Sequence, residues 1–386
     1  MNTIHWFEVK QLDRVTNYSS RTECVKSILE AGGSIYYYCT FAKKRVYYGL
    51  QGNIVYLGMF KNKVFKFLEF QILVMLKSLQ IVLSKDRDAI IVNQDLVHLM
   101  KPCVWINKLL KKHNKFILDV RTLPTDTVGF EQSMNKYYKQ MADAVRLFDG
   151  LSFITPYMEK VSLKPFHCEL PTVNWSSGVN IQLFDASQYD YTRDNDTFRI
   201  FYHGGISESR GNLDLIKACA LVKERGYNIE LVQIGKIVDT FLQEYIKNNH
   251  YESWCHLYDA KPLNQIPAWV AKCDLPLLPF PDYLPWRVSS PIKLMEYMAM
   301  GKPVLVPNME CFTDILSEES GLVYYYSLKA DNVVEEMANA IIRRVKNTPI
   351  ETTYVKSPVC INFVSERFTW KHQAEKLMQF CLNLCR

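Results

Sequence analysis

Short apolar runs, rich in β-branched and aromatic residues, alternate with segments of helical periodicity along all 386 residues of the chain. The alternation predicts twelve strands, which are His5–Val9, Ser34–Phe41, Asn53–Leu57, Ala89–Asn93, Lys115–Val120, Gly150–Thr155, Phe198–His203, Ile229–Ile234, Cys255–Tyr258, Leu275–Phe280, Pro303–Val306 and Leu322–Tyr325. Strands joined by helices pair in parallel and bury both faces of their sheet. The sequence therefore predicts an α/β protein of doubly wound parallel sheets.

The length of the chain and one polar interruption divide this pattern into two domains. Twelve strands are too many for one ordinary sheet, and 386 residues exceed the usual size of one compact domain. The stretch Phe184–Ile200 is polar, acidic and without periodicity. We predict an N-terminal domain at 1–182 and a C-terminal domain at 183–369, with a terminal helix at about 370–386 that packs back on the first domain. Two Rossmann-like domains of this kind face each other across a cleft at the carboxyl ends of their strands.

Charge and cysteine content argue against several classes of protein. The net charge is only +6 and the basic residues are dispersed, so nucleic acid is not an expected partner. The 11 cysteines are scattered without a Cys-x-x-Cys pair, and the histidines show no metal-ligand spacing. We expect reduced thiols in a cytosolic setting and no bound metal. The N-terminus does not resemble a signal peptide.

The longest apolar segment, Met59–Leu83, is interrupted by Lys61, Lys63, Lys66 and Lys77. We therefore expect no membrane-spanning helix here. Two interpretations stay open. The segment is either a helix packed on a sheet, or a basic and aromatic helix that lies in a membrane interface with its lysines near anionic headgroups.

A glycine turn follows the predicted strand Phe198–His203. Gly204 and Gly205 are followed by a polar turn, Arg210 and a helix. Paired glycines let backbone N–H groups approach a phosphate closely, and the next helix presents its positive end. Arg210 adds a permanent cation that can bind phosphate oxygens with two hydrogen bonds. The alternative is a plain strand-to-helix turn.

A lone glutamate, Glu296, lies in the apolar helical segment SSPIKLMEYMAMG. Pro291 suits the first turn of this helix and Gly301 its end. Because the helix follows a strand, its N-terminus would lie at the cleft, where Ser290 and free N–H groups favour an anion. A carboxylate one turn inside repels phosphate, but it accepts two hydrogen bonds from vicinal hydroxyls such as those of a ribose. Phosphate and diol together describe a nucleotide. On an isolated helix, Glu296 would simply face water.

These two stretches, YHGGISESRG and SSPIKLMEYMAMGKPVLV, resemble the donor-binding half of retaining glycosyltransferases of family 4, glycosyl transferases group 1 with the GT-B fold. The stretch NWSSGVNIQLF resembles the family's link between domains, and ERFTWKHQAEKLM its terminal helices. The resemblance implies that a sugar nucleotide binds to the C-terminal domain, with Arg210 on its diphosphate and Glu296 on its ribose. The expected donor-binding residues are Gly204, Gly205, Arg210, Ser290, Ile292, Lys293, Leu294 and Glu296.

Two positions depart from the family's pattern. The first glutamate of its Glu-(seven residues)-Glu motif would fall at Val288, and its common arginine after the first glycine of the turn is Gly205. Both losses remove contacts to the donor. We expect Lys293, in the first turn of the helix, to supply part of the missing positive charge.

The N-terminal domain should bind the acceptor. The stretch FILDVRTLPTDTVGF places Asp119, Arg121 and Asp126 at the end of a strand and resembles the DVRDL stretch of some bacterial sugar transferases. We predict that Arg121 and Asp126 act in catalysis together with Arg210, the alternative being a structural Asp119–Arg121 network. The first strand-to-helix loop gives three candidates for acceptor binding, which are Asn17, Ser19 and Arg21.

The leading hypothesis is a metal-independent retaining hexosyltransferase without a cofactor. It would move a sugar from a nucleoside-diphosphate sugar to a glycan or lipid-linked acceptor in the synthesis of surface polysaccharides or glycoconjugates. We expect a cytoplasmic location at the inner face of the plasma membrane, with peripheral membrane contact. Two alternatives remain, a sugar-nucleotide epimerase of the same fold and a catalytically silent subunit that binds nucleotide sugar.

Overall fold

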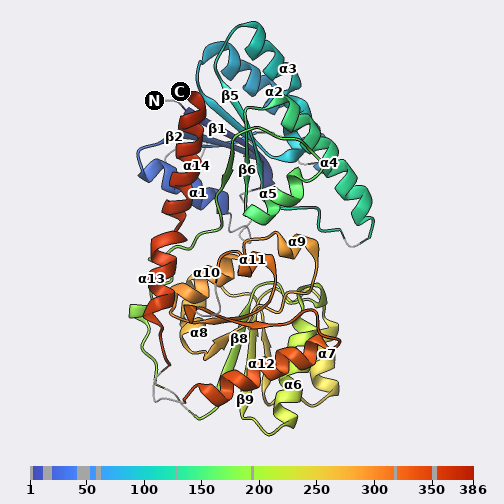
Figure 1. Ribbon diagram of the computed structural model, residues 1–386, viewed down its shortest axis with the longest axis vertical. Coiled ribbons are helices and arrows are strands. Elements are labelled where there is room, and N and C mark those ends of the chain that lie inside the picture. Colours follow the sequence, from blue (N-terminus) through green and yellow to red (C-terminus); the bar gives the residue numbers. More distant parts are fainter. Residues whose placement is uncertain are drawn as a thin grey trace. The chain divides into compact units, whose positions relative to one another are not determined.

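The computed structural model describes residues 3–11, 20–40, 53–57, 62–126, 128–192, 195–316, 320–349 and 354–386. The chain divides into two compact units (Figure 1). The first comprises residues 1–178, 288–290 and 370–386, and the second comprises residues 179–287 and 291–369. The main boundary falls at Gly178, a few residues before the predicted one at Gln182.

The first unit is built on a seven-stranded parallel sheet of order β3-β2-β1-β4-β5-β6-β7. Its strands are β1 (Thr3–Gln11), β2 (Ser34–Thr40), β3 (Ile54–Tyr56), β4 (Ala89–Val92), β5 (Lys115–Val120), β6 (Gly150–Phe153) and β7 (Thr172–Asn174). Its helices are α1 (Ser20–Glu30), α2 (Lys63–Ser84), α3 (Val97–Leu109), α4 (Phe130–Leu147), α5 (Pro156–Leu163) and α14 (Trp370–Cys385). The terminal helix α14 packs beside α1, and the two share a core with Trp6 and Trp175.

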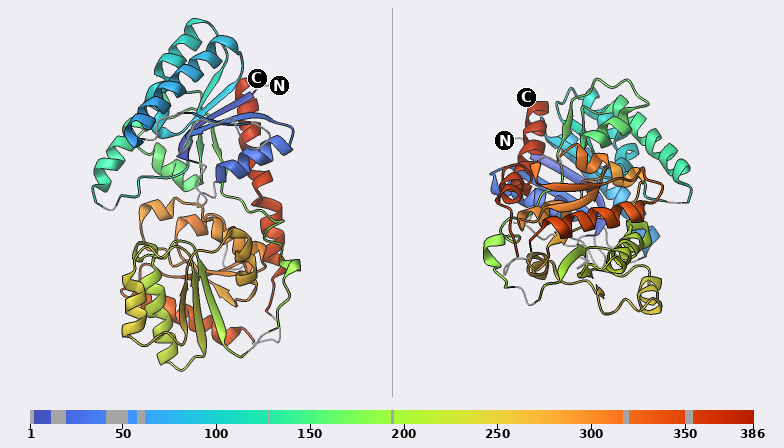
Figure 2. Two further views of the ribbon diagram at one scale, coloured as in Figure 1. Left: turned by 180° about the vertical axis from the view of Figure 1, so that it is seen from behind. Right: turned by 60° about the horizontal axis from the view of Figure 1, so that its bottom comes forward.

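The second unit contains a four-stranded sheet of order β10-β9-β8-β11 and a two-stranded sheet, β12-β13. Its strands are β8 (Phe198–His203), β9 (Ile229–Ile234), β10 (Cys255–Tyr258), β11 (Leu275–Pro276), β12 (Val304–Pro307) and β13 (Val323–Tyr326). Its helices are α6 (Asn212–Glu224), α7 (Phe241–Asn248), α8 (Ile266–Ala271), α9 (Leu284–Arg287), α10 (Ile292–Ala299), α11 (Glu310–Thr313), α12 (Val333–Asn347) and α13 (Pro358–Arg367). Figure 2 shows the elements of both units from two further sides.

The predicted fold class is confirmed. All twelve predicted strands are present, and every strand pair in the described part of the chain is parallel. The one strand that the pattern missed is β7. It has three half-buried residues at the edge of its sheet, so it carries neither a long apolar run nor a clear alternation.

Helix α2 bears on the two interpretations of the segment Met59–Leu83. By length and composition its stretch Val64–Ser84 is apolar enough to cross a membrane, although lysines interrupt it and no spanning helix was expected. Only 28% of this stretch is buried. Helix α2 packs on the first unit with one side, through Phe70, Val74 and Ile81, and exposes the other, so both interpretations of the segment stay open.

Candidate functional site

The glycine turn at the end of β8 is shaped by close backbone contacts. Gly204 has a φ of +129°, which side chains rarely adopt, and a Cβ there would lie 2.1 Å from Cε of Lys293. A Cβ on Gly235, after β9, would lie 1.6 Å from the carbonyl oxygen of Gly204. The turn therefore needs glycine at both positions. Both Gly204 and Gly205 are half-buried, and Gly204 lies beside the Lys293 side chain.

Arg210 returns to this turn from the short helix Glu208–Arg210. Its Nε lies 3.2 Å from the place where a Cβ on Gly205 would stand, and its guanidinium lies over the ring of Trp286, 5.0 Å from the centroid. The Trp286 indole N–H donates to the carbonyl of Ser209 (3.2 Å), which fixes the ring. Arg210 thus lies in the space that a side chain at position 205 would enter. No motif in the sequence pointed to Trp286.

Glu296 is buried, with 3% of its surface exposed, and so is every residue of α10 from Leu294 to Ala299. Nε2 of His203 donates to a Glu296 carboxylate oxygen at 2.8 Å. The Tyr297 hydroxyl accepts from the His203 backbone N–H (2.9 Å) and lies 3.0 Å from Nδ1 of the same ring. With Nε2 protonated, Nδ1 is left as an acceptor for the tyrosine O–H. Glu296 is therefore held at the end of β8, and it is not a surface residue.

Lys293 carries the second cation of the site. Burial lowers the pKa of the Lys293 ammonium to about 8, the charge of Arg210 acts in the same direction, and Glu296 opposes both. The structure thus brings together Gly204, Gly205, Arg210, Lys293 and Glu296 at the end of β8. Two cations suit a diphosphate, and a fixed carboxylate suits a diol.

We expect nucleotide-sugar affinity to fall as the pH rises above about 8. A bound diphosphate raises the pKa of Lys293, so above about pH 8 the complex holds one proton more than the free protein. The affinity for the nucleotide sugar then falls by up to about tenfold per pH unit. Titration calorimetry with a nucleotide sugar between about pH 7 and 9 measures this slope. The Lys293→Met variant should bind more weakly with a flat profile. A flat profile in the unaltered protein would contradict the assignment.

Two of the predicted donor contacts, Ser290 and Leu294, have their side chains engaged elsewhere. Ser290 groups with the first unit, where its hydroxyl lies 2.6 Å from that of Ser176 and accepts from the Ser177 N–H. The side chain of Leu294 is fully buried, and its N–H donates to the carbonyl of Pro291 (3.1 Å). Ile292 begins α10 beside Lys293 and is half-buried. The side chains of Ser290 and Leu294 are therefore not directed at a donor.

The missing glutamate position is buried too. Val288 has no exposed surface, and its carbonyl accepts from the hydroxyl of Thr155 at 2.8 Å within the first unit. The valine packs as a core residue, so its surroundings suit an apolar side chain and not a buried carboxylate. This geometry accounts for an apolar residue at this point of the motif.

In the first unit, Asp119 and Arg121 form the structural network that the sequence left open. Arg121 donates to the carbonyls of Trp175 and Ser176, and its guanidinium lies 3.5 Å from the centroid of the Trp175 ring. Asp119 accepts from Ser152 (2.8 Å) and from the Trp175 indole N–H (3.2 Å). Burial lowers the pKa of Arg121 to about 10 and raises that of Asp119. Because the core holds its guanidinium, Arg121 is not available for the predicted catalytic role.

The acceptor-loop candidates have different outcomes. Arg21 is mostly buried and pairs with Glu8, with Nε 3.0 Å from the carboxylate, and Glu8 also accepts from the Tyr37 hydroxyl. The guanidinium of Arg21 is therefore engaged within the first unit. Asn17 and Ser19 lie outside the described residues.

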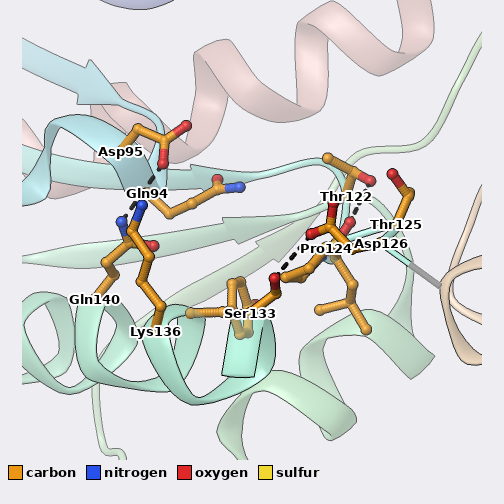
Figure 3. Close-up of a pocket in the computed structure, with 11 residues that line it drawn as sticks. Gln94, Asp95, Thr122, Pro124, Thr125, Asp126, Ser133, Lys136 and Gln140 are labelled. Atoms are coloured by element: carbon orange, nitrogen blue, oxygen red, sulfur yellow. Dashed lines mark hydrogen bonds between the residues drawn. The ribbon is translucent and has the colours of Figure 1, made fainter. Parts of the chain in front are cut away.

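Asp126 lines a polar cavity of about 320 Å³ in the first unit (Figure 3). It accepts from the hydroxyl of Ser133 at 2.8 Å, while Gln140 and Asp95 lie 3.5 Å apart across the cavity. The cavity lies where β4 and β5 end, against the N-terminal half of α4. Its lining residues are Gln94, Asp95, Thr122, Leu123, Pro124, Thr125, Asp126, Ser133, Lys136, Tyr137 and Gln140. The sequence pattern indicated Asp126 here but not the residues of α4.

Among the described residues, no group of three or more His, Cys, Asp or Glu side chains could hold a metal ion.

Comparison with known proteins bears on the second unit and on the fold. A family model described as Glycosyl transferases group 1 matches residues 197–347. No curated protein matches the chain by sequence. The fold is similar to that of sucrose-phosphate synthase from Thermosynechococcus elongatus, at 13% identity and a TM-score of 0.70 over 98% of both chains.

Two further solved structures have the same fold. One is HepE from Anabaena in complex with UDP, at 14% identity and a TM-score of 0.70 over 98% of this chain and 99% of that chain. The other is the lipopolysaccharide outer core galactosyltransferase WaaB, at 14% identity and a TM-score of 0.68 over 99% of both chains. Together with the family match, they confirm the predicted resemblance to group 1 glycosyltransferases and the GT-B fold of two Rossmann-like domains. Membership of family 4 stays a prediction.

Proposed function

We propose that the protein is a retaining glycosyltransferase, because residues 197–347 match the family model of the glycosyl transferases group 1. It moves a hexose from a nucleoside-diphosphate sugar to a glycan or lipid-linked acceptor in surface polysaccharide or glycoconjugate synthesis. The observation that carries the proposal is the buried Glu296–His203 pair beside the glycine turn, with Arg210 and Lys293 around it.

The proposed chemistry follows from charge development on the leaving group. As the bond between sugar and diphosphate breaks, negative charge grows on the phosphate oxygens. Arg210 and Lys293 stabilise this charge without needing to reorganise. We propose that they make a metal ion unnecessary. Glu296 accepts hydrogen bonds from the ribose hydroxyls and so fixes the nucleotide.

The choice of donor to test first comes from the similar structures. HepE has been solved with UDP and with UDP-glucose. We propose a uridine nucleotide sugar as the first candidate donor for this chain.

We propose that the cavity around Asp126 receives the terminal sugar of the acceptor. Amide, hydroxyl and carboxylate groups offer both donors and acceptors for sugar hydroxyls. The two carboxylates of Asp95 and Asp126 outnumber the single ammonium of Lys136, which disfavours a phosphate. Asp126 then binds the acceptor in this cavity.

Lys136→Ala is expected to raise the acceptor KM about tenfold or more, since a hydrogen bond from a charged donor contributes about 1.5–3 kcal/mol. Lys136 is exposed at the cavity rim, and no partner of its ammonium is found in the described part of the chain. The donor KM and donor hydrolysis without acceptor should not change. Lys139→Ala, an exposed lysine of the same helix outside the cavity, is the control. Equal acceptor KM values for both variants would place the acceptor elsewhere.

The silent-subunit alternative has one observation in its favour, the buried valine at position 288. A thermal-shift screen over UDP-, GDP-, ADP- and dTDP-sugars, followed by a donor-hydrolysis assay, separates the two functions. A ligand at about 100 times its Kd stabilises the folded state by about 2.7 kcal/mol. A shift with slow hydrolysis supports a transferase, whereas a shift without any hydrolysis or transfer supports a silent subunit. No shift with any nucleotide sugar would overturn the proposal.

We also propose a cytoplasmic location at the inner face of the plasma membrane, where nucleotide sugars and lipid-linked acceptors meet.

A further inference from the structure

Helix α2 exposes an apolar face that its own unit does not cover. Seven large side chains are 41–65% exposed, namely Val64, Phe65, Phe67, Leu68, Ile72, Leu76 and Leu83. All but Phe67 fall within one side of the helix, because their spacing follows the helical period. The opposite side is buried through Phe70, Val74 and Ile81. The helix therefore lies against the first unit along its whole length, with an apolar stripe facing outward.

Helix α3 carries further exposed apolar side chains. Trp105, Leu109 and Leu110 are 46–64% exposed near its C-terminal end. The two helices pack side by side (Figure 1). Between them, the Cys103 thiol donates to the carbonyl of Met75 at 3.9 Å. Monomeric soluble proteins rarely expose contiguous apolar patches of this kind without a partner. We call the ten exposed residues of α2 and α3 the α2–α3 face.

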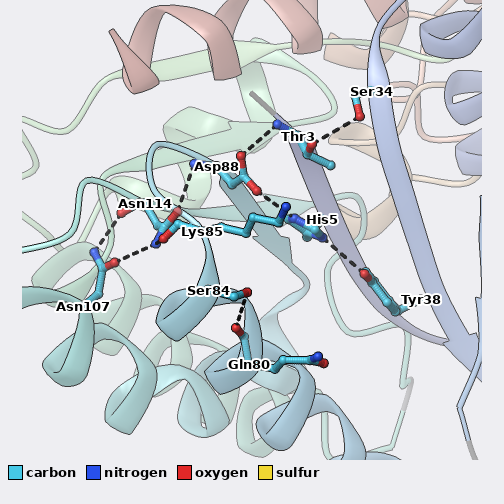
Figure 4. Close-up of polar contacts among 10 residues, drawn as sticks. All are labelled: Thr3, His5, Ser34, Tyr38, Gln80, Ser84, Lys85, Asp88, Asn107 and Asn114. Atoms are coloured by element: carbon cyan, nitrogen blue, oxygen red, sulfur yellow. Dashed lines mark hydrogen bonds and ion pairs between the residues drawn. The ribbon is translucent and has the colours of Figure 1, made fainter. Parts of the chain in front are cut away.

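A buried polar network holds the C-terminal ends of the two helices together (Figure 4). The Asn114 amide donates to the carbonyl of Lys85 after α2 (3.1 Å) and to the side chain of Asn107 in α3 (3.1 Å). Asn114 also accepts from the backbone N–H of Asp88, whose carboxylate bonds to His5 in β1 (3.1 Å). The α2–α3 face is therefore a fixed surface of the first unit.

Exposed cations lie at the C-terminal ends of α2 and α3. Lys85, Arg87, Lys108 and Lys111 are exposed, and Asp86 is the one exposed carboxylate in the segments 84–88 and 108–113. These cations are not the lysines of the segment Met59–Leu83 that the sequence pattern suggested.

Two lysines of α2, Lys66 and Lys77, do not line its apolar face, and the side chain of Lys63 lies outside the described residues. Lys66 is buried, and half-buried Lys77 donates to Gln80 at 3.0 Å. Both lie on the side of the helix away from the exposed stripe. The cations that flank the face come from the loops after α2 and from the end of α3.

We propose that the α2–α3 face docks on an anionic lipid bilayer. The apolar stripe enters the interface and the cations at its end contact the headgroups, a combination that binds peripheral proteins to membranes. The buried side of α2 packs on its own sheet unit, so the helix lies along the membrane and does not span it. The inference rests on the proposed membrane location and is independent of the transfer reaction.

Flotation of the full chain with phosphatidylcholine vesicles, with and without phosphatidylglycerol, tests the proposal at low and high salt. Binding should need the anionic lipid and weaken with salt. The variant Leu68→Gln/Ile72→Gln/Leu76→Gln should bind at least about tenfold more weakly, since each side chain loses apolar burial. Lys108→Glu/Lys111→Glu should lose at least about fivefold per position at low salt.

Matched controls lie in the second unit. Val238→Gln/Phe241→Gln/Val359→Gln changes three exposed apolar residues, and Lys247→Glu/Lys261→Glu changes two exposed lysines. Both controls should bind vesicles like the unaltered protein. Circular dichroism and thermal unfolding check that every variant is folded.

Three results would overturn the proposal. One is no binding to anionic vesicles at low salt, and another is an equal loss in test and control variants. The third is a concentration-dependent dimer, seen by light scattering and broken by the α2 variant, without vesicle binding, because it would assign the face to a second copy of the chain. A nucleotide-sugar thermal shift that persists in these cases shows that only the docking surface, and not the proposed transferase function, has failed.

Discussion

Turnover is expected to fall by about 10²–10³ when Arg210 is replaced by alanine, which corresponds to about 2–4 kcal/mol of transition-state stabilisation. The guanidinium lies over Trp286 and beside Gly205, so it is already in place when charge develops on the diphosphate. Arg210→Lys should recover only part of the loss, because an ammonium neither stacks on the indole in the same way nor forms two parallel bonds. Steady-state transfer with a working acceptor measures both variants.

Arg225→Ala is the control for Arg210. Arg225 lies on the surface of the same unit and pairs with Glu335 and Asn339, an arrangement that contributes little to stability. It should leave kcat and KM unchanged. If Arg210→Ala keeps turnover within about a factor of two, Arg210 only shapes the turn and the assignment of the diphosphate site fails.

Glu296→Gln is expected to weaken nucleotide-sugar binding by about 1.5–3 kcal/mol, the contribution of a hydrogen bond to a charged acceptor. The glutamine carbonyl can still accept from Nε2 of His203, which lies 2.8 Å from the carboxylate in the unaltered protein. The fold should therefore survive, with thermal unfolding close to that of the parent. Titration calorimetry with the best donor from the thermal-shift screen measures the loss.

The alanine variant provides the contrast for Glu296. Glu296→Ala leaves His203 without its partner in a buried site, so it should lower stability as well as affinity. If a folded Glu296→Gln protein binds the donor with parental affinity, the carboxylate serves only to hold His203 and takes no part in nucleotide binding.

The strands and the glycine turn could be predicted because their causes are local. Apolar runs of β-branched residues and the glycines after β8 restrict the backbone through their own chemistry, whatever packs on them later. Position along the chain also indicated Arg210, Lys293 and Glu296, since parallel strands bring their carboxyl ends to one edge of a sheet. The predictions failed for side chains whose partners lie far away in sequence, as for Arg121 and Ser290.

The sequence by itself determined the alternation of strands and helices, the parallel pairing and the residues at the glycine turn after β8. Only the tertiary structure decided which side chains are buried and which partners they meet. Glu296 is a fixed carboxylate because His203, 93 positions earlier in the chain, donates to it. Arg121 is a core residue because Trp175 lies under its guanidinium. On α2, the apolar stripe faces outward and Lys66 inward, since the sheet and α3 cover only one side of the helix. Burial and pairing depend on residues far apart in sequence, and no local pattern encodes them.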